Sequence, residues 1–391
     1  MKKKIKMIGK IMILFSLVIL IISYIIYDAN QKLKSQIPQF EELKETGMEK
    51  RQCKRINSDY SFEDIFQLND EFIIASTIFD DIYEFKYYNE YMTKGKIFAF
   101  NLKTEELFEI PIKNFPKTIS FSPLGIDILN KEFLFVINHN GTPKGSNDRI
   151  EIFKIHLSGE KGIELTYEKS IILPDRYFGT LNGVAAIDLN SFYFTTWQVF
   201  SLPLKPSIYE KILYKIKEIL NMILLSYNIK GNYVYLYDEG KISKLEKSGA
   251  IFTNGIVYDS TNKFLFAVRT IEKDILIYKI ADYGKEGSKI GSIKTPYSVD
   301  NIFFKDNKLY CGINSNLHMV GKIKSAIKEK GNANDISHFS GFMEISLNQG
   351  NKITDILLQD KFKCVSSGIK VENKTIMSSF ADKGLYVCQE K

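Results

Sequence analysis

The sequence is short of cysteine and histidine and has no strongly basic region, and each shortage narrows the functions to consider. Its four cysteines, Cys53, Cys311, Cys364 and Cys388, form no Cys-x-x-Cys pair, so the spacing of a thiolate zinc site is absent. Beyond the first ten residues the lysines are dispersed, and no basic stripe interleaved with aromatic residues is present. Such a charge pattern argues against a nucleic-acid-binding protein. No exact internal repeat divides the chain.

The composition is that of a folded protein rich in strands. Of 391 residues, 45% are apolar and 13% are aromatic, enough to bury a sizeable core. The 22 tyrosines and 28 phenylalanines, with many isoleucines, favour strands over helices. The net charge of +7 is modest, and much of it lies in the first ten residues.

One long apolar run stands at the N-terminus. Residues 11–27 follow a lysine-rich start and contain only Ser16 and Ser23 as polar interruptions. A run of this length is close to the lower limit for crossing a bilayer. The positive flank predicts a signal anchor over residues 1–27, with its N-terminus in the cytoplasm and the rest of the chain on the far side of the membrane. A cleaved signal peptide, which would give a secreted protein, and a buried core helix are the alternatives.

The polar residues 28–52 then read as a juxtamembrane stalk. Asn140-Gly-Thr and Asn373-Lys-Thr are glycosylation sequons that a secretory lumen would make usable. We therefore expect a membrane-anchored protein whose body is extracytoplasmic.

From Cys53 onward, short strand-like segments recur between Asn, Asp, Gly and Lys residues. Examples are Phe133-Leu-Phe-Val-Ile-Asn, Tyr233-Val-Tyr-Leu-Tyr and Phe264-Leu-Phe-Ala-Val. Groups of strands recur about every 50–60 residues, which predicts an all-β fold over residues 53–391, a six-bladed β-propeller. A pair of β-sandwiches is the competing architecture.

A segment of helical periodicity interrupts this β pattern at residues 206–227. Its apolar positions Ile208, Ile212, Ile216, Ile219 and Ile223 share one helix face, and Ser207 with Glu210 has the spacing of a capping box. We expect an inserted amphipathic helix. It would either pack across one face of the propeller or lie against a membrane.

Five acid and amide residues lie on similar short turn-like segments far apart in the chain. They are Glu63, Asn182, Asn254, Asp300 and Asn301. Carboxylate and amide oxygens suit a hard cation such as calcium, and two carboxylates balance its charge. A site built from distant turns requires loops that converge on an axis, which again favours a propeller. The alternative is that they are ordinary turn residues, because Asn and Asp favour turns.

Cys53 and Cys388 stand near the two ends of the predicted propeller. A disulfide between them would fasten the first strand to the last and is permitted beyond the membrane. Alternatively, all four cysteines are buried thiols that pack as small apolar side chains.

A set of ordered short motifs gives the chain a family resemblance. The motifs are Glu63-Asp64, Phe121-Ser-Pro-Leu-Gly-Ile, Val136-Ile-Asn-His, Leu181-Asn-Gly-Val-Ala-Ala, Phe252-Thr-Asn-Gly-Ile, Val299-Asp-Asn-Ile and Leu385-Tyr-Val-Cys. Together they resemble the paraoxonase/arylesterase family of calcium-dependent esterases and lactonases, over most of the chain from Cys53 to Cys388. The gluconolactonase and strictosidine synthase groups fit the motifs less well.

The resemblance implies a function and a set of site residues. It implies a calcium-dependent hydrolase of aryl esters or lactones, whose catalytic calcium is held by the five acids and amides named above. It also implies that His139 assists the attack of water and that Cys53 pairs with Cys388. The histidines His156, His318 and His338 have no comparable context and receive no role.

This sequence departs from the family at three places. Leu124 replaces the first of two histidines that activate water, and Asp127 could substitute only if its side chain faced the tunnel. A second, structural calcium would use Asp64, the carbonyl of Ile126 and an acid at the position of Gly183. The missing carboxylate argues against that ion.

The third departure is in the substrate wall, where Trp197 would either contact an apolar substrate or fill a blade edge. Because of Leu124 and Gly183, the alternative function is a catalytically impaired propeller that binds a ligand or partner.

Overall fold

The structure is a computed structural model of the chain. It describes residues 23–29, 31–32, 46–47, 51–78, 95–139, 141–142, 145–146, 148–157, 162–173, 180–198, 216, 219–220, 223–224, 226–281, 286–315, 320, 322–323, 326, 335–336 and 338–391.

Three of the sheets are plain four-stranded antiparallel meanders, each built from consecutive strands. The first holds β12 (Thr180–Asp188), β13 (Ser191–Gln198), β14 (Val234–Asp238) and β15 (Lys241–Lys244). The second holds β16 (Thr253–Asp259), β17 (Phe264–Arg269), β18 (Asp274–Ile280) and β19 (Gly287–Lys294). The third holds β20 (Ser298–Lys305), β21 (Lys308–Asn314), β22 (Ser340–Ser346) and β23 (Lys352–Gln359).

The other sheets vary this plan. One has the order β5-β11-β10-β7-β6 and contains β5 (Ile112–Lys113), β6 (Pro123–Leu129), β7 (Phe133–Asn138), β10 (Arg149–His156) and β11 (Glu164–Ile172). A seven-stranded sheet joins β24 (Val365–Val371), β25 (Lys374–Ser379) and β26 (Lys383–Glu390) to β1 (Arg51–Gln67), β2 (Phe72–Ile78), β3 (Ile97–Asn101) and β4 (Leu107–Glu109). A small hairpin pairs β8 (Gly141–Thr142) with β9 (Gly145–Ser146).

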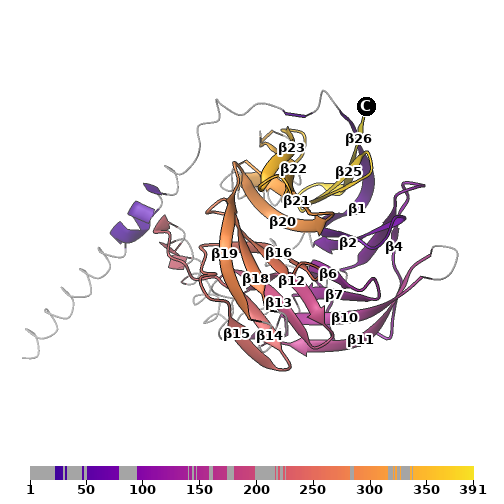
Figure 1. The fold of residues 1–391 in the computed structure, drawn as a ribbon, viewed down its shortest axis with the longest axis horizontal. Coiled ribbons are helices and arrows are strands. Elements are labelled where there is room, and N and C mark those ends of the chain that lie inside the picture. The colour runs from indigo at the N-terminus through magenta and orange to yellow at the C-terminus, as the bar shows by residue number, and fades with distance from the viewer. Residues whose placement is uncertain are drawn as a thin grey trace, which may run out of the picture.

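Two strands of the seven-stranded sheet and one strand of each other large sheet lie toward the middle of the molecule, and we call these the inner strands: β1, β6, β12, β16, β20 and β24. Each contacts the next in this order, and β24 contacts β1, so that the inner strands close a ring. Figure 1 shows β20, β16, β12 and β6 toward the middle and β19, β15 and β11 at the periphery. The arrangement is all-β and propeller-like, as the sequence predicts.

Packing between neighbouring sheets explains why the inner strands are apolar on both faces. Six of the nine residues of β12 and six of the eight in β20 are buried, whereas exposed residues alternate with half-buried ones along most of the outer strand β19. Leu124 and Phe135 of one sheet pack with Phe192 and Phe194 of the next in a single apolar cluster. The core is thus a series of layers between sheets.

The two ends of the chain meet in the seven-stranded sheet. The first part of β1 pairs with β26, and Cys53 lies opposite Cys388 in that register. The two cysteines form a disulfide, which confirms the predicted pairing. Cys311 and Cys364 are buried and lie outside this bond.

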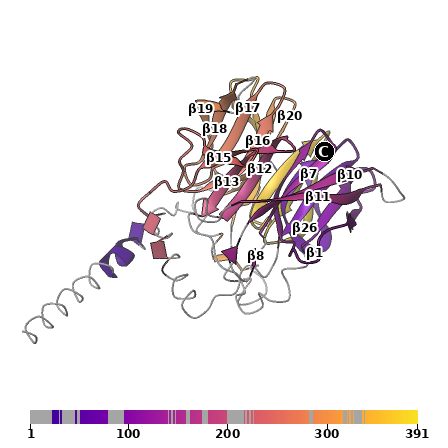
Figure 2. The same ribbon diagram turned by 90° about the horizontal axis from the view of Figure 1, so that it is seen from below.

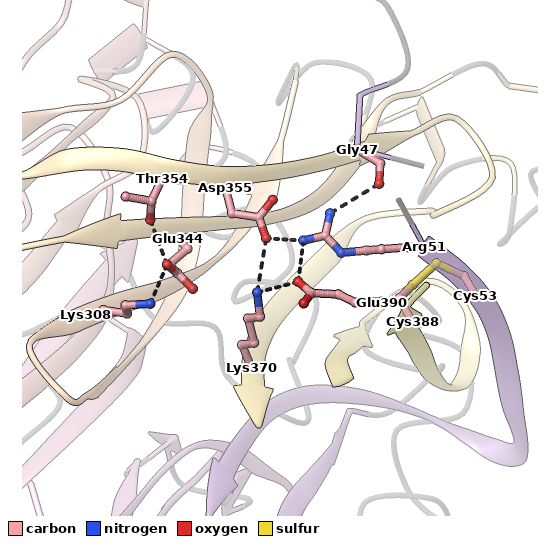
Figure 3. A network of polar contacts seen from close by, with 10 residues as sticks. All are labelled: Gly47, Arg51, Cys53, Lys308, Glu344, Thr354, Asp355, Lys370, Cys388 and Glu390. Carbon is pink, nitrogen blue, oxygen red and sulfur yellow. Dashed lines mark hydrogen bonds and ion pairs between the residues drawn. A yellow bond between two sulfur atoms is a disulfide. The ribbon is translucent and has the colours of Figure 1, made fainter. Parts of the chain in front are cut away.

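A cluster of charged groups lies beside the disulfide (Figure 3). The guanidinium of Arg51 contacts the carboxylate of Asp355 and lies 3.6 Å from that of Glu390. Lys370 lies 2.5 Å from Glu390 and 3.8 Å from Asp355. Because Asp355 belongs to β23, the cluster also connects the chain ends to the neighbouring sheet.

The N-terminal predictions fall largely outside the described residues. Of the predicted anchor and stalk, residues 23–29 are helical, and Thr46 pairs with Leu358 of β23. Within the described part of the chain, no helix is both long enough and apolar enough to cross a membrane. Asn373 is exposed in the turn between β24 and β25, and Asn140 lies outside the described residues.

The predicted insert at 206–227 is described only in part. Positions 216, 219–220, 223–224 and 226 are helical. The hydroxyl of Tyr227 donates to Asp28 at 2.7 Å, and the ammonium of Lys32 lies 3.8 Å from the centre of the Tyr227 ring. The end of the insert therefore touches the helical residues near the N-terminus, and Figures 1 and 2 both show the two segments side by side.

Candidate metal centre in the ring of inner strands

Each inner strand interrupts its pairing with its outward neighbour at one comparable place, and β12 has two further register shifts, between 180 and 181 and between 186 and 188. The interruptions lie between residues 62 and 64, 123 and 126, 181 and 184, 253 and 256, 299 and 302, and 365 and 367. The residues inside them are Glu63, Leu124, Gly125, Asn182, Gly183, Asn254, Gly255, Asp300, Asn301 and Ser366. All five predicted metal ligands are in this set.

The structure corrects one aspect of the sequence interpretation. The five residues lie inside strands β1, β12, β16 and β20, and not on turns between strands. A bulge explains the resemblance to a turn, because an extra residue interrupts the hydrogen-bond ladder and re-aims its side chain. Ser366 occupies the equivalent place in β24, and no sequence signal marks it because serine is common elsewhere in the chain. Its hydroxyl donates to the Phe62 carbonyl at 3.1 Å.

Contacts place the five residues next to one another around the ring. The side-chain amide of Asn254 donates to the carboxylate of Asp300. The amide of Asn301 donates to the backbone carbonyl of Glu63 at 3.2 Å. A Cβ added at Gly183 would lie 3.1 Å from the carbonyl oxygen of Asn254, so Asn182 and Asn254 are on adjoining strands at the same level.

All five of these residues are buried, and two of them have a side-chain oxygen without a hydrogen-bond partner. All five residues are between 2% and 8% exposed. Among the described residues, the amide oxygens Oδ1 of Asn182 and Asn254 are buried without a hydrogen-bond partner. A buried oxygen without a partner is costly, about 1–3 kcal/mol, unless another group satisfies it. A hard cation bound by oxygen is such a group, so the residues present fit calcium.

The centre has only two carboxylates, because its other predicted ligands are amides. Accordingly, the described residues contain no cluster of three or more His, Cys, Asp or Glu side chains with metal-binding geometry. This composition distinguishes the candidate centre from zinc sites, which use histidine and cysteine.

The second, deeper site is a poor fit. Both carboxylate oxygens of Asp64 already accept backbone amides, from Ile65 at 2.9 Å and from Ile126 at 3.1 Å. Burial, with the nearby charge of Glu63, raises the pKa of Asp64 to about 8. The amide of Gly183 donates to the Thr195 hydroxyl, which would lie 3.1 Å from any Cβ at position 183. Thr195 thus occupies the space that the missing acid would need. We therefore propose no second calcium ion.

His139 follows β7 directly and lies at the ring. Its Nε2 is 2.9 Å from the carbonyl oxygen of Leu181, the residue before Asn182, and 3.8 Å from Oδ2 of Asp148. The sequence drew attention to His139 but not to Asp148. In the sequence, Asp148 is recognisable only as an acid that directly precedes a strand, β10, which begins ten residues after His139.

The other candidate base does not have the required geometry. Asp127 accepts the amide of Ile128 at 2.8 Å through one oxygen and that of Ala186 at 2.6 Å through the other. Burial raises its pKa to about 7. Because one oxygen accepts an amide of its own strand and the other joins β6 to β12, the side chain is a structural connection. Leu124 is 5% exposed and belongs to an apolar cluster against which Phe380 also packs.

The indole of Trp197 packs edge-to-face on Phe252, with 5.5 Å between ring centres. This contact is compatible with both expectations for Trp197, and its contact with an apolar substrate stays a prediction.

We predict that Gly255→Ala destabilises the protein by about 1–3 kcal/mol, because an added methyl group would overpack this place. A Cβ there would lie 2.6 Å from the Cα of Asn301 and 2.7 Å from the amide nitrogen of Ile302. The matched control is Gly291→Ala in β19, whose Cβ would meet nothing within 4 Å. Urea unfolding should leave the control within about 0.5 kcal/mol of the original protein. Equal stability of the two variants would show that β16 and β20 do not approach each other as closely at Gly255 as the structure has them.

Comparison with known proteins places this geometry in context. The model of the family described as Arylesterase matches residues 85–320. No curated protein sequence matches the chain.

Among solved structures, the luciferin-regenerating enzyme has 10% identity and a TM-score of 0.49, covering 87% of this chain and 95% of its own. The gluconolactonase from Xanthomonas campestris has 10% identity and a TM-score of 0.46, covering 91% and 94%. The allergen Mala s 1 from Malassezia sympodialis has 11% identity and a TM-score of 0.47, covering 88% and 97%.

Proposed function

The chain belongs to the arylesterase family, and on that premise we propose that it is a calcium-dependent hydrolase of aryl esters or lactones. The family places it among esterase- or lactonase-type enzymes that act on small molecules. That the enzyme needs calcium, and that its substrates are aryl esters or lactones, is what we propose beyond the family membership.

The observation that carries the proposal is the pair of buried amide oxygens on Asn182 and Asn254, with the carboxylate of Asp300 in contact with Asn254. Together with Glu63 and Asn301 these side chains would hold the ion. A bound calcium would polarise the carbonyl of the ester or lactone and stabilise the negative charge that forms on its oxygen.

The protein itself supplies position and a proton acceptor. The ring of inner strands fixes the ligands on bulges, where packing against the neighbouring strand leaves them little freedom. His139 accepts a proton from the attacking water through Nδ1. Its other ring nitrogen, Nε2, is occupied by the carbonyl oxygen of Leu181. Leu124 is buried in an apolar cluster and supplies no second base.

We further propose that the propeller has six blades. Five large sheets are described, and the seven-stranded one contains two inner strands, β1 and β24. Counting it as two blades that share the long strand β1 gives six. The disulfide and the charged cluster at Arg51 would then close the ring (Figure 3).

The proposed location is extracytoplasmic, with a membrane anchor at residues 1–27. The disulfide supports an oxidising compartment. The contact between Asp28 and Tyr227 brings the exposed Tyr24 and Tyr27 near the insert, where Ile216, Ile219 and Leu220 are also exposed. Apolar side chains gathered beside an anchor favour the interpretation in which the insert faces lipid. If the compartment is a secretory lumen, we expect the exposed Asn373 to be glycosylated.

A second candidate function rests on Leu124. A chain without the first histidine could bind calcium and a ligand while it hydrolyses slowly or not at all. In that case Leu124→His should raise hydrolysis.

We predict that the purified protein hydrolyses phenyl acetate or an aliphatic lactone in calcium, and that a calcium chelator lowers the rate at least about 100-fold. The assay compares both substrates with calcium, with chelator, and with chelator followed by excess calcium. Recovery on adding calcium would separate metal removal from unfolding. A rate that the chelator leaves unchanged would contradict the metal mechanism, and tight calcium binding without turnover would favour the second function.

A further inference from the structure

Contacts from two other segments fix the ring of His139. Its Nε2 lies 2.9 Å from the carbonyl oxygen of Leu181, and its backbone amide donates to the carbonyl of Ser122 at 3.0 Å. Because a carbonyl oxygen only accepts hydrogen bonds, Nε2 carries the proton and Nδ1 keeps its lone pair. The nitrogen able to take a proton from water is therefore Nδ1.

Asp148 is fixed by the same peptide that orients this ring. Its Oδ2 accepts the backbone amide of Leu181 at 2.9 Å, and its carbonyl accepts the amide of Leu173 at 3.3 Å. Leu181 thus donates to Asp148 through its N–H and accepts from His139 through its C=O. Asn182 follows in the chain, so one main-chain unit sets the distances among the carboxylate, the imidazole and a candidate metal ligand.

The two side chains are close and poorly solvated. Oδ2 of Asp148 lies 3.8 Å from Nε2 of His139, and the side chains are 9% and 17% exposed. Burial raises the pKa of the Asp148 carboxyl, and positive charge on His139 lowers it. Opposite charges at this distance attract more strongly away from water than in it. A proton gained by His139 and ionisation of Asp148 therefore favour each other.

We propose that Asp148 is the positioning residue of His139, and that this carboxylate–imidazole pair takes the part of the histidine that is missing at Leu124. The inference rests on the proposed hydrolase function. In the reaction, water gives a proton to Nδ1 of His139 while its oxygen bonds to the carbonyl carbon. The carbon–oxygen bond to the leaving alcohol then breaks, and that alcohol takes up the proton. One water is consumed, and an acid and an alcohol, or a hydroxy acid from a lactone, are formed.

Asp148→Asn tests the charge alone, because an asparagine oxygen can still accept the amide of Leu181. We expect kcat to fall about 10- to 100-fold, with KM changed by less than about twofold, because the carboxylate acts on the protonated His139 that forms during the reaction. Calcium affinity and the unfolding midpoint should stay as they are. Asp148→Ser, which also keeps an acceptor without charge, serves if the first variant does not fold.

A double-mutant cycle distinguishes positioning of His139 from general damage. If Asp148 acts through His139, adding Asp148→Asn to His139→Gln should lower the remaining rate no further. A loss of the same size in both backgrounds would overturn the proposal, and so would a kcat of Asp148→Asn within twofold of the original protein.

A readout independent of turnover keeps the inference separate from the hydrolase proposal. The chain has four histidines, so 15N-histidine labelling gives few ring signals, and His139→Gln assigns the one of interest. We expect the original protein to show His139 with Nε2 protonated, and the ring nitrogen shifts of His139 to change in Asp148→Asn because the charge 3.8 Å from Nε2 is lost. Identical ring signals would refute the pairing. If the original protein hydrolyses neither substrate, the function proposal fails while these signals still decide whether the pair exists.

Discussion

Replacing Asp300 with asparagine should lower calcium affinity at least about 100-fold and bring hydrolysis to background, because calcium sites depend strongly on the number of charged ligands. Asp300 contributes one of the two carboxylates of the candidate centre and contacts the amide of Asn254. Asparagine keeps the shape and an acceptor oxygen for that contact while removing the charge. Calorimetric calcium titration and the ester assay measure the two effects.

The matched control is Asp306→Asn, an exposed acid in the turn beyond the other end of β20. Asp306 has a φ of 52°, which asparagine tolerates well, so the fold should be unaffected. Asp300→Ala is the harsher variant and should also abolish both properties. An active Asp300→Asn or Asp300→Ala protein would remove the metal from the account.

Loss of the disulfide should be the largest single change in stability outside the ring. The bond joins residues separated by 335 positions, and breaking so long a loop closure should lower the free energy of unfolding by about 2–5 kcal/mol. Urea unfolding of the double variant Cys53→Ala and Cys388→Ala measures this loss.

A reducing agent supplies the control for that experiment. It should destabilise the original protein by a similar amount and leave the double variant unchanged. The Arg51 cluster would still connect β1, β23 and β26 in the variant (Figure 3), so a folded but weaker protein is expected. Unchanged stability would mean that these charges and the β1–β26 pairing close the fold without the disulfide.

The candidate ligands could be predicted because their chemical type is visible in a sequence. Acids and amides that follow or interrupt apolar stretches stand out, and the family motifs put Glu63, Asn182, Asn254, Asp300 and Asn301 in order. What the sequence did not reveal is that bulges present them. A bulge depends on how two strands pair, and pairing is a property of the fold rather than of the local residues.

Asp148 was missed for a related reason. Its role depends on the Leu181 peptide, which is far away in sequence and contributes only backbone atoms. Asp127 was considered instead because it is close to Leu124 in the chain, yet its carboxylate faces the amide of Ala186. Gly183 was recognised as a missing acid, but only the structure shows that the Thr195 hydroxyl stands beside it.

A crystal structure of the protein grown with calcium would show directly whether the ring of inner strands binds the ion. We predict one ion inside the ring of inner strands, bound by Glu63, Asn182, Asn254, Asp300 and Asn301, with Oδ1 of both Asn182 and Asn254 directed at it. It also predicts no ion beside Asp64. A ring that holds no ion at saturating calcium, with Asn254 still donating to Asp300, would contradict the account.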